Sequence, residues 1–155
     1  MLHEDVTDTV IHAFYRVYNT LGYGFPERVY ENAMAVELRK SGLKVESQKG
    51  IQVRYASEAV GEYFADLLVA DKVIVELQAA RTISEDHEDQ LINYLKATDV
   101  EVGLLLNFGQ RPEFRRKLFQ NPLKHKIEHG LNGSPRREGY PAASVPITTK
   151  TGTHF

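Results

Sequence analysis

Two acidic residues in the middle of the chain could share one site. Asp66 and Glu76 lie in two apolar segments separated by the three residues Ala70-Asp71-Lys72. If those three residues form a hairpin turn, Val69 faces Val73, and Asp66 lies directly opposite Glu76. Opposed Cβ atoms are about 5 Å apart, where two charges repel by roughly 3 kcal/mol at an effective dielectric near 20. A bound divalent cation or a shared proton removes that repulsion.

Magnesium suits such a pair, because it takes a few carboxylates and keeps several waters for a substrate phosphate. A water activated by the ion can attack a phosphodiester, and the ion stabilises the charge that develops. Alternation along a strand places Gln78 on the same face as Glu76. Two alternatives stay open at this point: a two-residue turn would break the pairing, and the acids could be scattered on a surface hairpin.

Other chemical motifs are weaker. The sequence has no glycine-rich phosphate loop and no H-E-x-x-H motif, so an enzyme acting on another phosphate ester lacks support. His125 and His129 are four residues apart, but their polar surroundings are more typical of solvated side chains than of metal ligands.

The elements that must position the acids can be predicted from periodicity. Apolar residues recur at helical spacing from Val6 to Leu21, and Gly22 ends this first helix. The glycine- and proline-containing residues 22–26 predict a tight loop. A second helix is expected over residues 27–41, ending at Gly42.

The pattern then changes to period 2. Strands are predicted over residues 44–55, with a bend at Gly50, over 62–69 after a turn at 56–60, and over 73–78. Ser84, followed by four acidic residues within five, predicts the start of a helix that runs to about Thr98. Residues 102–108 predict a strand buried on both faces, and residues 112–119 a short closing helix. The order ααβββαβα indicates an α/β fold with a mixed central β-sheet flanked by helices.

The chain has 155 residues, of which 42% are hydrophobic, enough for one domain with a core. We expect the domain to span residues 1–120 and a disordered basic and polar tail to span 121–155. Acidic residues outnumber basic ones up to residue 110, and the balance reverses beyond it. The acidic body argues against gripping DNA by charge alone, whereas the basic segment could contact phosphates or simply be solvated.

The composition also predicts a cytoplasmic protein with no membrane association. Cysteine is absent, which excludes disulfides and thiolate metal sites and suits a reducing compartment. The N-terminus has no basic and apolar signal pattern. The longest apolar runs are too short to span a bilayer.

Several motifs in order resemble one known family. They are Gly24-Phe25-Pro26-Glu27-Arg28-Val29-Tyr30, residues 61–69 around Asp66, residues 73–77 around Glu76, residues 87–96 and residues 103–109. Over about residues 5–120 the chain resembles the GxxExxY proteins, a group assigned to the PD-(D/E)XK nuclease superfamily. The resemblance implies a restriction-endonuclease-like fold, Mg²⁺ or Mn²⁺ as cofactor, and nucleic acid as partner, with DNA favoured over RNA.

The resemblance also implies roles for individual residues. Asp66 would bind the metal, and Glu76 would be the acidic residue of the second motif. Glu31 resembles the first-motif glutamate of junction-resolving members, and Glu27, one turn earlier, could complete the site instead. Gln90 and Tyr94 form the Q-x-x-x-Y of exonuclease-like branches and could contact substrate phosphate.

One position departs from the superfamily pattern, which usually has lysine two residues after the glutamate. This chain has Gln78, which can orient a water but brings no positive charge. Two hypotheses follow. The first is a Mg-dependent nuclease that hydrolyses phosphodiester bonds, with Asp66, Glu76, Gln78 and either Glu31 or Glu27 as catalytic residues. The second is a catalytically reduced module that keeps the fold and binds nucleic acid or a protein.

Overall fold

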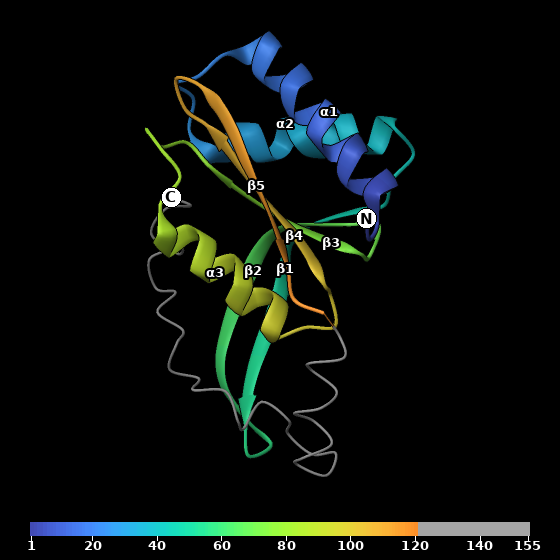
Figure 1. The fold of residues 1–155 in the computed structure, drawn as a ribbon, viewed down its shortest axis with the longest axis vertical. Coiled ribbons are helices and arrows are strands. Elements are labelled where there is room, and N and C mark those ends of the chain that lie inside the picture. The colour runs from blue at the N-terminus through green and yellow to red at the C-terminus, as the bar shows by residue number, and fades with distance from the viewer. Residues whose placement is uncertain (121–155) are drawn as a thin grey trace.

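In a computed structural model, which describes residues 1–120, three helices and five strands form one layered α/β unit (Figure 1). The elements are α1 (Glu4–Leu21), α2 (Glu27–Lys40), β1 (Val45–Tyr55), β2 (Glu58–Val69), β3 (Val73–Gln78), α3 (Glu85–Lys96), β4 (Val102–Phe108) and β5 (Pro112–Leu118). The predicted tail, residues 121–155, lies outside the described residues. Among residues 1–120, no helix is long and apolar enough to cross a bilayer.

The sheet follows the chain, in the order β1-β2-β3-β4-β5. Only β3 and β4 are parallel, and the other neighbours are antiparallel. This mixed sheet confirms the predicted fold class. The parallel pair needs a crossover, and α3 provides it.

Helices cover both faces of the sheet (Figure 1). The apolar stripes of α1 and α2 pack on alternate residues of the central strands, including Leu67, Val75 and Leu104. On the other face, Leu91 and Leu95 of α3 pack against Ile74 and against the strand residues that alternate with those of the first face. Residues of β3 and β4 therefore face a core on either side, and every residue of both strands is buried.

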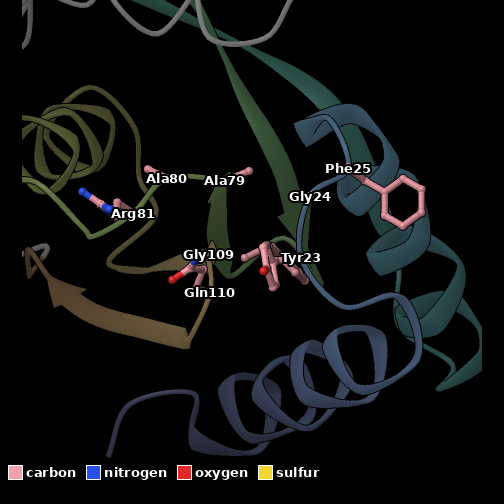
Figure 2. Close-up of a pocket in the computed structure, with 9 residues that line it drawn as sticks. Tyr23, Gly24, Phe25, Ala79, Ala80, Arg81, Gly109 and Gln110 are labelled. Atoms are coloured by element: carbon pink, nitrogen blue, oxygen red, sulfur yellow. The ribbon is translucent and has the colours of Figure 1, made fainter.

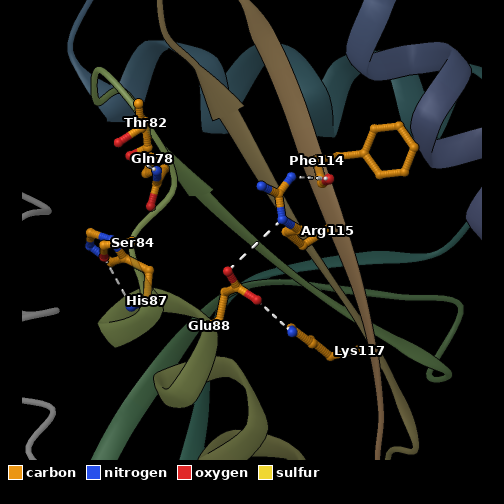
Figure 3. Close-up of polar contacts among 8 residues, drawn as sticks. All are labelled: Gln78, Thr82, Ser84, His87, Glu88, Phe114, Arg115 and Lys117. Atoms are coloured by element: carbon orange, nitrogen blue, oxygen red, sulfur yellow. Dashed lines mark hydrogen bonds and ion pairs between the residues drawn. The ribbon is translucent and has the colours of Figure 1, made fainter.

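The last element was predicted as a helix, and that prediction is wrong, because residues 112–118 form β5 on the edge of the sheet. Phe114 packs on the α1–α2 side, whereas Lys117 and Arg115 reach Glu88 of α3 on the other side, at 2.5 and 3.9 Å (Figure 3). These residues alternate between faces as in a strand. Pro112 is tolerated because it is the first residue of an edge strand.

Two loop predictions also need correction. The turn expected at residues 56–60 is only the pair Ala56 and Ser57, both with positive φ, so that β2 begins at Glu58. Gly50 is paired regularly with Phe64; in β1 the register shifts between Val53 and Arg54, and Gln48 has a positive φ of 52°. The Ser84 cap is confirmed: its hydroxyl oxygen accepts from the His87 N–H at 3.3 Å (Figure 3).

Candidate functional site

The β2–β3 hairpin has the predicted register. Ala70 and Asp71 adopt positive φ in a three-residue turn, after which Val69 pairs with Val73 and Leu67 with Val75. The pairing ends there. Beyond it β2 stays with β1 while β3 continues beside β4, so the two strands part where Asp66 and Glu76 lie.

The two carboxylates bridge the parted strands. Glu76 Oε2 accepts a hydrogen bond from the Asp66 backbone N–H at 2.8 Å, and Asp66 Oδ2 accepts one from the Leu77 N–H, also at 2.8 Å. Both side chains are buried, with 1% and 3% of their surface exposed. Buried carboxylates need compensation, and backbone N–H groups provide part of it. The remaining negative charge favours a cation.

Gln48 joins this pair to helix α2 and was missed by sequence reasoning. It lies across from Asp66, between the regular pairs Ser47–Leu67 and Lys49–Ala65. Its amide Nε2 donates to Glu31 Oε1 and Oε2 at 3.0 and 3.2 Å, and to Asp66 Oδ1 at 3.4 Å. A positive φ inside a strand has no sequence signal at a glutamine, so only the folded structure reveals it.

The two glutamates of α2 lie at different places along the site. Glu31 is buried beside Gln48 and is thereby linked to Asp66. Glu27, one turn earlier, accepts from the Ala79 N–H at 3.4 Å, just beyond the end of β3. Glu31 thus lies next to the carboxylate pair, and Glu27 lies where the chain leaves the sheet.

Gln78 is buried, but it is held by its own loop. Its Nε2 donates to the Thr82 carbonyl at 3.2 Å (Figure 3), and its Oε1 has no hydrogen-bond partner among residues 1–120. The side chain thus keeps one polar atom available for a water or substrate group.

Gln90 and Tyr94 approach from helix α3. Gln90 Nε2 donates to the Tyr94 hydroxyl at 3.1 Å, and both side chains are buried. Burial raises the pKa of the Tyr94 phenol, and the negative charges of Glu76 and Asp66 raise it further. Tyr94 therefore lies within the field of the carboxylate pair and stays protonated at neutral pH.

The donor set suits a hard cation. Among residues 1–120, no group of three His, Cys, Asp or Glu side chains is arranged to hold a metal ion by itself. Magnesium, however, takes one or two protein carboxylates and completes its shell with water and substrate oxygens. The oxygen atoms of Asp66 and Glu76 fit that requirement, with Glu31 adjacent through Gln48.

A hollow of about 310 Å³ lies just beyond the ends of β3 and β4 (Figure 2). Three segments line it: residues 23–25 of the α1–α2 loop, residues 79–81 after β3, and residues 108–110 after β4. Ala79 belongs both to this lining and to the contact with Glu27.

Comparison with known proteins gives one family match. The model of the PD-(D/E)XK nuclease superfamily matches residues 4–117. None of the curated proteins matches the sequence.

Similar solved structures include the following two. The protein titled SSO0001 is 16% identical with a TM-score of 0.47, and the match covers 70% of this chain and 61% of that one, so this chain matches less than two thirds of its length. An alkaline exonuclease from Laribacter hongkongensis is 11% identical, also with a TM-score of 0.47, covering 98% of this chain and 87% of the other.

Proposed function

Since the chain belongs to the PD-(D/E)XK nuclease superfamily, we propose that it is a divalent-metal-dependent nuclease that hydrolyses phosphodiester bonds in nucleic acid, with DNA favoured over RNA as the substrate. The observation that carries the proposal is the pair of buried carboxylates, Asp66 and Glu76, at the point where β2 and β3 part. Mg²⁺ or Mn²⁺ is the proposed ion. When bound, it supplies an activated water and neutralises charge on the phosphate.

The residues around the pair have separate tasks in this proposal. Asp66 and Glu76 bind the ion through oxygen atoms, and Gln48 holds Glu31 next to them. Tyr94 keeps its proton and can donate it in a hydrogen bond to a substrate oxygen, oriented by Gln90. These positions are fixed before substrate arrives, which is what electrostatic stabilisation of a transition state requires.

Within the superfamily we place the chain with the GxxExxY proteins. The motif residues have structural tasks that support this placement. Gly24 has φ 111°, which L side chains rarely adopt. Glu27 accepts from the Ala79 N–H, and the Tyr30 hydroxyl donates to the Gly22 carbonyl at 2.6 Å.

A cleavage assay tests the proposal. Wild type and Asp66→Asn are incubated with Mn²⁺ or Mg²⁺ and with single- and double-stranded DNA. We expect metal-dependent cleavage by wild type and a loss of at least about 100-fold in Asp66→Asn, because a charged ligand is removed. Asp71→Asn is the matched control, since Asp71 is exposed in the hairpin turn and pairs with Lys44. Equal activity of the two variants would contradict the proposal.

A second function, a binding module without catalysis, is favoured by Gln78. Where the resembled superfamily usually has a lysine, this chain has a neutral amide bonded to Thr82. In that case the wild type would bind DNA but leave it intact with every divalent metal, and Asp66→Asn would bind equally well.

A further inference from the structure

The hollow lined by residues 23–25, 79–81 and 108–110 lies beyond the carboxyl ends of the parallel strands β3 and β4 (Figure 2). Its volume, about 310 Å³, is at the lower end of the range for small-ligand pockets. It can accept one ring-bearing group but not a duplex. It is separate from the residues proposed to bind metal, and only the contact between Glu27 and Ala79 joins the two.

The loop that forms one wall is pinned by a fully buried tyrosine. The Tyr30 hydroxyl donates to the Gly22 carbonyl at 2.6 Å and accepts from the Phe25 N–H at 3.2 Å. These bonds hold both ends of the segment that carries Tyr23.

The other two walls are pinned as well. Asn107, also fully buried, accepts from the Ala80 N–H at 2.9 Å and donates to the Ala80 carbonyl at 3.0 Å. The Tyr18 hydroxyl lies 2.8 Å from the Gly109 carbonyl oxygen. A Cβ at Gly109 would lie 2.2 Å from the Ala80 oxygen, so this close approach requires glycine. A preformed pocket binds its ligand without the entropy cost of ordering loops.

The side chains at the rim have the chemistry of a nucleotide site. Tyr23 is 57% exposed and lines the hollow together with Ala79 and Gly109 (Figure 2). Arg81 has no ion-pair partner among residues 1–120, and its side chain extends away from the hollow into solvent. An aromatic face binds a base by stacking, and a guanidinium outside the hollow binds the phosphate that leads away from it.

We propose that this pocket holds one unpaired base of a single-stranded nucleic acid, stacked on Tyr23, with a neighbouring phosphate on Arg81. This inference rests on the proposed function, because it takes nucleic acid as the substrate. A paired base has both faces covered by its neighbours in the stack and cannot enter. Under this proposal, the protein's substrate is a single strand or a frayed end.

The chain contains no tryptophan, which permits a direct test of stacking. Tyr23→Trp places a lone indole at the pocket, and the full-length variant is titrated with a single-stranded oligodeoxynucleotide in the presence of a chelator. We expect quenching of the indole fluorescence, with at least about tenfold weaker binding of the matching blunt duplex. Tyr55→Trp, at an exposed position of the β1–β2 hairpin, is the control and should not be quenched.

Affinity measurements on variants separate stacking from charge. Tyr23→Ala should bind the single strand about tenfold more weakly, since loss of one stacking contact typically has that effect, whereas Tyr23→Phe should bind like wild type. Arg81→Ala should weaken binding and reduce its salt dependence.

Failure of this inference differs from failure of the proposed function. If wild type cleaves DNA with Mn²⁺ but Tyr23→Trp is not quenched, or is quenched equally by duplex, the pocket assignment is overturned and the nuclease stands. If single strands quench the indole but no metal supports cleavage, the pocket is upheld and the nuclease proposal fails.

Discussion

Gln48 combines a strained backbone with a central hydrogen-bonding position. Its left-handed conformation costs an L residue roughly 1–2 kcal/mol, and its amide donates to both Glu31 and Asp66. The amide N–H groups thus lie between two carboxylates, where a cation would also be favourable. Strain of this kind is commonly found at functional sites.

Replacing this amide tests its role. Gln48→Met keeps the length of the side chain but removes the donors, so we expect the metal-free protein to lose about 1–2 kcal/mol of unfolding free energy. Urea unfolding with a chelator measures it. Gln52→Met is the matched control, because Gln52 is exposed on the same strand. If both variants unfold at the same urea concentration, Gln48 does not stabilise the acidic cluster.

Gln78→Lys tests the departure from the superfamily pattern. A cation on the same strand face as Glu76 restores the usual arrangement and should raise the rate of any metal-dependent cleavage. It should also weaken metal binding, because like charges then share the site. Steady-state cleavage and metal titration measure the two effects. Gln52→Lys adds the same charge outside the site, and an equal rate gain there would rule out a specific role for position 78.

Among the elements, the α1–α2 loop depends on Tyr30 most directly. Tyr30→Phe retains the ring stacked on Phe108, with centroids 4.2 Å apart, but loses the bonds to Gly22 and Phe25. We expect a loss of about 1–3 kcal/mol in unfolding free energy and weaker binding of single-stranded DNA. Thermal unfolding and fluorescence anisotropy measure these changes.

Tyr15→Phe is the control for Tyr30→Phe, since Tyr15 is only partly buried and no hydrogen bond is seen to its hydroxyl within the described part of the chain. A Tyr30→Phe variant as stable as Tyr15→Phe would show that the loop is held by packing alone.

The sequence alone was sufficient to predict the positions of the helices and strands in which apolar residues recur regularly over a long segment. Helices α1, α2 and α3 and strands β3 and β4 lie where apolar spacing and the Ser84 cap predicted them. The hairpin register followed from a three-residue turn, which placed Asp66 beside Glu76.

Segments governed by tertiary contacts could not be predicted. Residues 112–118 have Phe114 and Leu118 at helical spacing, and pairing with β4 overrides that spacing. The conformation of Gln48 depends on Glu31 and Asp66, which are 17 and 18 residues away along the chain.

At the scale of the whole molecule, both core clusters are described within residues 1–120, and the sequence of residues 122–155 has no periodic apolar pattern. Removal of residues 122–155 should therefore leave the melting temperature within about 2 °C of the full-length value, as measured by calorimetry. The removed segment has five Lys and Arg residues against two Glu residues, so its loss should lower the salt dependence of DNA binding. A large fall in melting temperature would show that the core extends into that segment.

The central claim is that Asp66 and Glu76 form a metal site, and metal-linked thermal stability tests it most directly. An ion that binds only the folded pair at ten times its Kd adds about 1.4 kcal/mol of stability. We predict that Mn²⁺ or Mg²⁺ raises the melting temperature of wild type and Asp71→Asn by several degrees and leaves Asp66→Asn and Glu76→Gln unchanged. Equal gains in all four proteins, or none in wild type, would contradict the account.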